Sequence, residues 1–184
     1  MVCGRAIVER VRDGLVPALG EAVLITNEPG LYAGLGIRAR PDRHPGAGPV
    51  AGIEAALEWA REEGRPGALV VACDMPFLDP LGLRLLVERG VDADADAVAA
   101  GTEPGGERPP VCMYFSTRCL PAVEQVLASD DRSIRRLLAL VETEWVSSTE
   151  MARHRHVDTM FFNVNTPADL VRAEQLAREL DEHA

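Results

Sequence analysis

The stretch LVVACDMP, residues 69–76, decides the fold class of this chain of 184 residues. An unbroken apolar run that ends in an acidic residue and a proline is typical of a parallel strand buried on both faces. Such a strand presents the carboxylate of Asp74 at the carboxyl edge of the sheet, where open α/β sheets bind their ligands. A helix cap or an ion pair would account for a lone aspartate equally well, so the rest of the chain has to decide between these interpretations.

Helical and extended patterns alternate from one end of the chain to the other. Helices are predicted at residues 7–19, 80–86, 120–127, 134–140 and 167–180. Another is predicted to follow the turn-rich segment 40–49 directly, with Ile53, Ala56, Leu57 and Ala60 on one face, and to be stopped by Gly64 and Pro66. Strands are predicted at residues 22–26, 37–39, 69–74, 95–100, 111–115 and 144–147, with a loop at 102–110. Strands separated by helices imply a single domain, residues 1–184, with a three-layer α/β/α architecture and a mainly parallel, Rossmann-like sheet.

One predicted helix has a clear start signal. Asp79 stands at its cap position and Pro80 at its first position. We expect Leu81, Leu85 and Leu86 to face the core from this helix.

The composition argues against several classes of protein. A formal net charge of −10 disfavours a nucleic-acid partner, because that affinity comes largely from basic residues that neutralise phosphates. No apolar run approaches the roughly 20 residues that span a bilayer, so we expect no membrane association and a cytoplasmic location. The four cysteines show no CxxC spacing, which predicts free thiols rather than a zinc site or disulfides.

A glycine-rich segment, GAGPVAG at residues 46–52, runs directly into a predicted helix. Such a segment exposes successive N–H groups at the positive end of a helix, which suits an anion or a closely approaching nucleotide. It is equally consistent with a tight loop whose glycines only serve helix packing. Taken alone, the segment does not choose between these interpretations.

In combination, the short motifs of the chain resemble the molybdenum cofactor guanylyltransferase family. In order, they are Asn27, Asp42, GPVAG at residues 48–52, CDMP at 73–76 and FNVNTP at 162–167. This family, also called molybdopterin-guanine dinucleotide biosynthesis protein A, belongs to the nucleotidyltransferases of glycosyltransferase-A-like fold. The resemblance implies transfer of GMP from GTP to the phosphate of molybdenum-bound molybdopterin, with release of pyrophosphate. Molybdoenzymes or their chaperones are the protein partners that it implies.

The resemblance also implies a set of site residues. Asp74 matches the magnesium-binding aspartate, and we expect it to be both a Mg²⁺ ligand and a catalytic residue. The implied nucleotide site comprises Asn27, Asp42, Gly48, Gly52, Asp74, Asn163 and Asn165. Because the attacking group is already a phosphate anion, the reaction needs alignment and charge neutralisation rather than a strong base. Mg²⁺ held by a carboxylate suits that task.

The chain departs from the family pattern at its start. Family members begin with a strand and a signature of the form LAGGxSxRMGxDK, whose backbone, arginine and lysine hold the triphosphate. Here only residues 1–3 precede the segment that should follow this signature. We therefore expect an incomplete N-terminus without that first strand and phosphate loop, and exposed strand edges beside the gap.

Two other functions stay open at this point. One is a truncated or degenerate protein without catalysis that keeps a nucleotide or pterin surface. The other keeps the fold and changes the substrate, as in cytidylyl transfer to the same cofactor or nucleotidyl transfer to a sugar phosphate.

Overall fold

The computed structural model describes residues 1–101, 111–151 and 157–181, so the predicted loop at 102–110 lies outside the described residues. The strands are β1 (Val23–Ile25), β2 (Arg38–Arg40), β3 (Gly67–Val71), β4 (Ala97–Ala100), β5 (Cys112–Ser116) and β6 (Thr143–Val146). The longer helices are α1 (Ile7–Leu19), α2 (Pro49–Glu62), α3 (Pro80–Asp92), α4 (Leu120–Leu127) and α8 (Pro167–Asp181). The shorter helices are α5 (Ile134–Leu138), α6 (Ser148–Met151) and α7 (Val157–Met160), with 3-10 helices η1 (Pro29–Leu35) and η2 (Thr117–Cys119).

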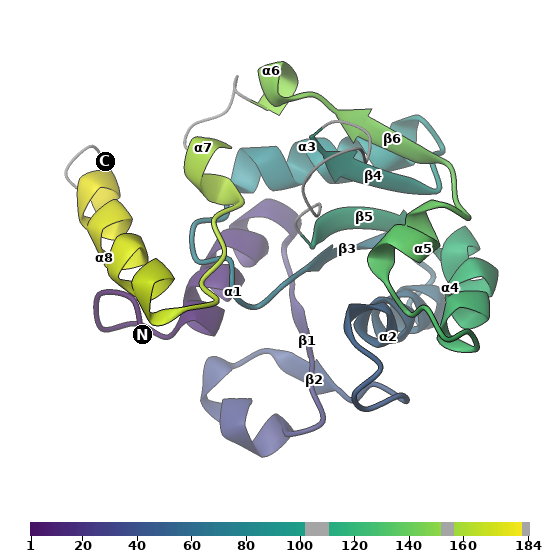
Figure 1. The fold of residues 1–184 in the computed structure, drawn as a ribbon, viewed down its shortest axis with the longest axis horizontal. Coiled ribbons are helices and arrows are strands. Elements are labelled where there is room, and N and C mark those ends of the chain that lie inside the picture. Colours follow the sequence, from purple (N-terminus) through teal and green to yellow (C-terminus); the bar gives the residue numbers. More distant parts are fainter. Residues whose placement is uncertain (102–110, 152–156, 182–184) are drawn as a thin grey trace.

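The strands form two sheets rather than one. β1 and β2 pair in parallel, and the other four strands form a sheet in the order β3-β5-β4-β6. In this sheet β4 and β6 are parallel, whereas β5 lies antiparallel between β3 and β4. The predicted α/β fold is confirmed, with β5 as the strand that departs from a parallel arrangement (Figure 1).

Helices cover both faces of the four-stranded sheet. Along β5, Met113 and Phe115 pack in one core cluster, whereas Cys112 and Tyr114 pack in the other. This alternation follows from the two-residue period of a strand, which sends successive side chains to opposite faces. The first cluster includes residues of α2, α4 and α5, and the second includes residues of α1 and α3. The result is the predicted three-layer arrangement.

The start of α3 is as predicted, but its inward face is not. The Asp79 carboxylate accepts hydrogen bonds from the backbone N–H groups of Leu81 and Gly82, at 3.0 and 2.8 Å. Leu83 and Leu86 are fully buried, whereas Leu81 is 51% exposed and its predicted core position is wrong. Residues three apart share one helix face, and Leu81 lies more than half a turn away from Leu83.

β3 is only half-buried along its whole length, so the expectation of a strand buried on both faces is wrong. The reason lies in its neighbours. β5 pairs with one edge of β3, and no described strand pairs with the other edge. The β1–β2 pair lies on that open side, and a groove separates it from β3.

Ion pairs attach the β1–β2 pair to helix α2. The Arg40 guanidinium donates to both carboxylate oxygens of Glu62, at 2.6 and 2.7 Å. Arg38 donates to Glu63 of the same helix end at 3.0 Å. These pairs are largely exposed, so each contributes little to stability and is screened by salt. None of the helices that the structure describes has the length and apolar character needed to cross a membrane.

Candidate functional site

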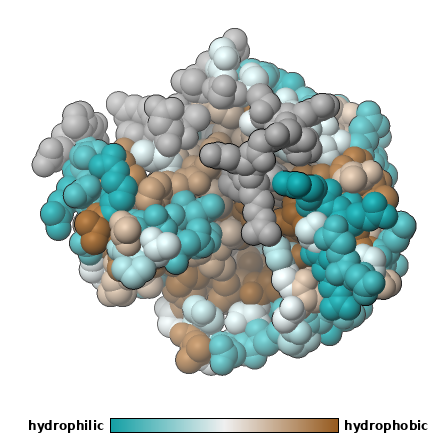
Figure 2. All heavy atoms as spheres, in the orientation of Figure 1, coloured by the Kyte–Doolittle hydropathy of each residue, from teal (hydrophilic) through white to brown (hydrophobic). Residues whose placement is uncertain are grey.

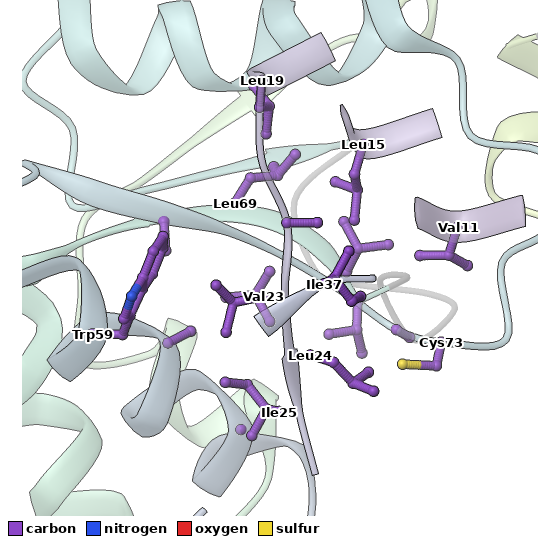
Figure 3. Close-up of a pocket in the computed structure, with 18 of the residues that line it drawn as sticks. Val11, Leu15, Leu19, Val23, Leu24, Ile25, Ile37, Trp59, Leu69 and Cys73 are labelled. Carbon is purple, nitrogen blue, oxygen red and sulfur yellow. The ribbon is translucent and has the colours of Figure 1, made fainter. Parts of the chain in front are cut away.

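The groove between the two sheets encloses a cavity of about 480 Å³. Figure 2 shows hydrophobic atoms exposed in a hollow near the middle of the molecule. In Figure 3 side chains reach into this groove from α1, β1, β3 and α2, among them Leu15, Val23, Leu69 and Trp59. Its walls are mainly apolar.

Three of the predicted nucleotide residues line the groove: Asp42, Gly48 and Gly52. Gly48 has a φ of +80°, which an L side chain rarely adopts, and it stands at the cap position of α2. At Gly52 a Cβ atom would meet nothing within 4 Å, so the helix surface is open there. The first turn of α2 thus offers backbone N–H groups and free space at a positive helix end, an arrangement that suits an anion.

Asp42 has a structural role whether or not it binds a base. One of its carboxylate oxygens accepts the backbone N–H of His44 at 2.9 Å, which is a local turn bond. The side chain is half-buried. The structure therefore places Asp42 at the groove and also in the turn that precedes α2.

Asp74 follows β3 at the rim of the same groove, next to the lining residue Cys73. Its Oδ1 atom is buried and has no hydrogen-bond partner. No basic side chain of the described residues lies within ion-pair distance of it, and the helix cap in this segment is Asp79. A buried, unpartnered carboxylate oxygen costs free energy, so the structural interpretations of Asp74 as cap or ion pair do not account for it.

A second unpartnered oxygen lies close by in the fold. The backbone N–H of Val164 donates to the carbonyl oxygen of Asp74 at 2.9 Å, and this bond brings the segment before α8 against the end of β3. The Oδ1 atom of Asn163, one residue away, is also buried without a partner. The structure thus brings Asp74 and Asn163 together, although they are far apart in the sequence.

These atoms suit a hard divalent cation. Carboxylate and amide oxygens are the ligands that Mg²⁺ accepts, and it commonly takes only one or two carboxylates from the protein and the rest from phosphates and water. No cluster of three His, Cys, Asp or Glu side chains with metal-binding geometry occurs among the described residues. The donor set therefore fits an ion shared with a phosphorylated ligand better than a closed, all-protein site.

Asn27 and Asn165 stand apart from the groove lining. Asn27 is exposed and follows the carboxyl end of β1, just as Asp42 follows that of the parallel strand β2. Asn165 is exposed too, and its backbone N–H donates to the Asp169 carboxylate at 3.0 Å as part of the cap of α8. Among the residues that the structure describes, no hydrogen bond joins either side chain to another of the predicted site residues.

Two buried acidic residues of α2 were not predicted from the sequence. Glu54 is only 6% exposed, and its Oε2 atom has no hydrogen-bond partner and lies 3.4 Å from Nε2 of His44. Glu58, one turn later, is 7% exposed and pairs with Arg43. The spacing of Glu54, Glu58 and Glu62 could have revealed them, because it puts three acids on one helix face. The segment before this helix carries several basic residues that can pair with that face.

Trp59 also lines the groove. The guanidinium groups of Arg38 and Arg65 lie 5.2 and 5.9 Å from the centre of its ring, within the range of a cation–π interaction. Glu21 pairs with both arginines.

Comparison with known proteins matches residues 1–155 to the MobA-like NTP transferase domain. This chain belongs to that family. MobA-like relatives include a probable molybdenum cofactor guanylyltransferase of Pelotomaculum thermopropionicum, 34% identical over 94% of this chain and 80% of its own length. The molybdenum cofactor guanylyltransferase of a Bradyrhizobium species is 33% identical over 100% of this chain and 86% of its own length.

The solved structures agree with this membership of the MobA-like family. The molybdopterin-guanine dinucleotide biosynthesis protein A of Archaeoglobus fulgidus superposes with a TM-score of 0.80 at 28% identity, over 97% of this chain and 89% of that chain. The 2-C-methyl-D-erythritol 4-phosphate cytidylyltransferase of Thermus thermophilus superposes with a TM-score of 0.63 at 24% identity, over 97% and 92% of the two chains. The second likeness shows a shared fold alone.

Proposed function

We propose that this protein transfers GMP from GTP to molybdenum-bound molybdopterin and releases pyrophosphate. Its family and the names of its relatives support this activity. The observation that carries the proposal is the pair of buried, unpartnered oxygens on Asp74 and Asn163. Asp74 directly follows Cys73, which lines the same groove as Gly48 and Gly52 at the start of α2. Unpartnered buried oxygens are expected where a ligand completes the hydrogen bonds or the coordination.

The start of α2 would hold the nucleotide. Gly48 and Gly52 carry no side chain, so a nucleotide can approach the helix backbone closely. The N–H groups of the first turn and the helix dipole favour negative charge there. Asp42, in the turn before this helix, would face the base.

Asp74 and Asn163 would hold a Mg²⁺ ion together with phosphate oxygens of GTP. When bound, the ion neutralises charge that develops around the α-phosphate during transfer. Asp74 fixes the position of the phosphates relative to the groove, and the bond from Val164 to its carbonyl oxygen keeps the Asn163 segment against it. The attacking phosphate is already an anion, so no side chain has to remove a proton from it.

GTP binding tests the proposal most directly. Calorimetric titration of GTP, with and without Mg²⁺, should show Mg²⁺-dependent binding to the unaltered chain and a loss of at least about tenfold in affinity in Asp74→Asn. The matched control is Asp92→Asn, which removes an exposed carboxylate at the end of α3. Equal affinity for GTP in Asp74→Asn and in the unaltered chain would contradict the assignment of the site.

The acceptor needs its own assay. Release of pyrophosphate from GTP should depend on molybdenum-loaded molybdopterin, and CTP should replace GTP poorly. A preference for CTP would instead favour cytidylyl transfer. We expect the reaction to take place in the cytoplasm and its product to pass to molybdoenzymes or their chaperones.

A further inference from the structure

The segment between β2 and α2 runs back along one face of α2. Three contacts between a basic and an acidic side chain join the two: Arg40 with Glu62, Arg43 with Glu58, and His44 with Glu54. As residue numbers rise along the segment, the partners step back along the helix, one turn at a time. Side chains four residues apart share one face of a helix, so a single face of α2 holds the segment.

The contact nearest to the start of α2 is incomplete. Arg40 donates to both carboxylate oxygens of Glu62, at 2.6 and 2.7 Å. By contrast, Nε2 of His44 lies 3.4 Å from Oε2 of Glu54, and that oxygen has no hydrogen-bond partner among the described residues. Glu54 is only 6% exposed, so its unpartnered oxygen carries a free-energy cost. A shift of the imidazole by roughly half an ångström would bring its N–H into hydrogen-bond range.

Glu54 faces away from the nucleotide side of α2. Gly52 and Ala56 of this helix line the groove, and the described lining residues do not include Glu54. Glu54 lies two residues from each of them, which places its side chain roughly 200° around the helix from Gly52. An effect of Glu54 on a nucleotide at the groove is therefore indirect and passes through another residue.

His44 is the residue that connects Glu54 to the groove. Its backbone N–H donates to the Asp42 carboxylate at 2.9 Å, and its carbonyl oxygen accepts the N–H of Ala47 at 2.9 Å. Asp42 lines the groove, whereas Ala47 is 8% exposed and packs in the core. A bond from the imidazole to Glu54 would thus fix the turn that carries the Asp42 carboxylate relative to the first turn of α2.

We propose that Glu54 is a positioning residue that holds the turn of Asp42 through His44 and thereby sets the preference for GTP over CTP. The inference rests on the proposed function and on the place of Asp42 beside the base. A carboxylate rejects the wrong base only if it cannot swing aside to find another donor. The His44 ring therefore donates its Nε2–H to Glu54, and this bond keeps the turn from moving when a mismatched base enters.

Glu54→Leu separates this role from a contribution to stability. Leucine keeps an apolar side chain of similar size in the buried position and removes the unpartnered oxygen, so the melting temperature should stay the same or rise. The ratio of GTP to CTP affinity should nevertheless narrow by about fivefold or more, measured by competition. An unchanged ratio in a folded Glu54→Leu protein would overturn the proposal.

Two further variants provide the rescue and the control. Glu54→Gln retains an oxygen that can accept the Nε2–H of His44, so its ratio should stay within about twofold of that of the unaltered chain. Glu124→Leu makes the same change as Glu54→Leu at an exposed position on α4 and should leave the ratio unchanged. An equal narrowing in Glu124→Leu would show a general effect of lost charge, and would overturn the proposal.

A double-mutant cycle tests whether Glu54 acts through His44. The side chain of His44 is 48% exposed, so His44→Leu supplies the readout even if Glu54→Leu fails to fold. His44→Leu should narrow the ratio of GTP to CTP affinity about as much as Glu54→Leu, and the double variant no further than either. Additive losses, or an unchanged ratio in His44→Leu, would overturn the proposal.

Amide hydrogen exchange tests the turn without any nucleotide. The amides of His44 and Ala47 should exchange about fivefold faster or more in Glu54→Leu, whereas the amide of Thr26, which donates to Arg40, should not change. Equal exchange of the turn amides with glutamate and with leucine would overturn the proposal.

The two proposals fail in different ways. Absence of Mg²⁺-dependent GTP binding in the unaltered chain would overturn the proposed function and the specificity role with it, while exchange at His44 and Ala47 would still decide whether Glu54 holds the turn. GTP binding with the same base preference in Glu54→Leu would overturn the role of Glu54 alone.

Discussion

The backbone N–H of Val164 donates to the carbonyl oxygen of Asp74 across 2.9 Å, and on each side of this bond a buried side-chain oxygen has no partner. The Oδ1 atom of Asn163 therefore accepts no hydrogen bond that would stabilise the fold. Its expected contribution is to ligand binding. The same holds for the Oδ1 atom of Asp74.

Asn163→Ala should accordingly separate stability from binding. We expect Mg²⁺-dependent GTP affinity to fall by about tenfold or more, while the melting temperature stays the same or rises slightly, because a buried unpartnered oxygen is removed. Calorimetry and thermal unfolding measure the two effects. Asn165→Ala, at an exposed position, is the control and should have the smaller effect on affinity. A large loss of stability in Asn163→Ala with unchanged affinity would make Asn163 a structural residue.

Asp42→Asn tests base recognition. The amide oxygen of asparagine can still accept the backbone N–H of His44, so the turn should survive. A carboxylate accepts hydrogen bonds from the N–H groups on the Watson–Crick edge of guanine, and an amide replaces one acceptor by a donor. The ratio of GTP to CTP affinity should therefore narrow by about tenfold or more, measured by competition. An unchanged ratio would limit Asp42 to its role in the turn.

Gly52→Ala should stabilise the fold and weaken nucleotide binding at the same time. The new Cβ meets nothing within 4 Å, and alanine in a helix interior is favoured over glycine by about 0.5–1 kcal/mol. The same methyl group stands where a nucleotide would approach α2. Denaturant unfolding and GTP titration measure the two changes. Increased stability with full GTP affinity would remove Gly52 from the nucleotide site.

Gly90→Ala is the matched comparison for that variant. Its Cβ would clash with the ring of Tyr114, a side chain that is 2% exposed and has little room to move. We expect a loss of about 1–3 kcal/mol in the free energy of unfolding. The pair of variants thus contrasts a glycine that makes room for the core with one whose open side faces the groove.

The cysteines should differ in reactivity according to burial and charge. Burial raises the pKa of Cys112 and of Cys119 to about 12, so neither should be alkylated before unfolding. Desolvation of the thiol and then the charge of Asp74 raise the pKa of Cys73, although part of this residue reaches the surface. The thiolate is the reactive form. Each rise of one pH unit, as long as the pH stays below the pKa of Cys73, should therefore speed its alkylation by about tenfold.

The variant Asp74→Asn tests how much of the raised pKa of Cys73 comes from the charge of Asp74. Asp74→Asn removes the negative charge, which should lower the pKa of Cys73 and speed its alkylation at a fixed pH near 8, as followed by mass spectrometry. The rate at Cys3 serves as the internal control. A rate at Cys73 that is the same with Asp74 and with Asn would show that burial alone sets its pKa.

The sequence predicts where the helices and strands lie better than it predicts which strands pair with each other. Residues 69–76 were interpretable as a strand with a carboxylate at its end, because hydrophobic period and proline placement act locally. The antiparallel direction of β5 was not predictable, because a run of apolar residues has no direction in its pattern. The half-buried state of β3 likewise depends on which strand lies beside it, and strand pairing is not encoded in either strand alone.

The candidate site shows the same division. The start of α2 could be located from its glycines and proline, since backbone geometry demands those residue types. The approach of Asn163 to Asp74 depends on a backbone bond between distant segments, and only the family resemblance pointed to it. Glu54 was missed because a glutamate in an amphipathic helix usually faces solvent.

The position of Trp59 gives the protein an optical probe of its own groove. Its indole has arginine guanidinium groups within 5.2 and 5.9 Å on residues of two different segments, and it borders the groove as well. Fluorescence of this indole depends on nearby charge and on contact with water, so its emission should shift when the groove fills or when salt loosens the β1–β2 pair. Trp145, on β6 and away from the groove lining, provides a constant background against which that shift can be read.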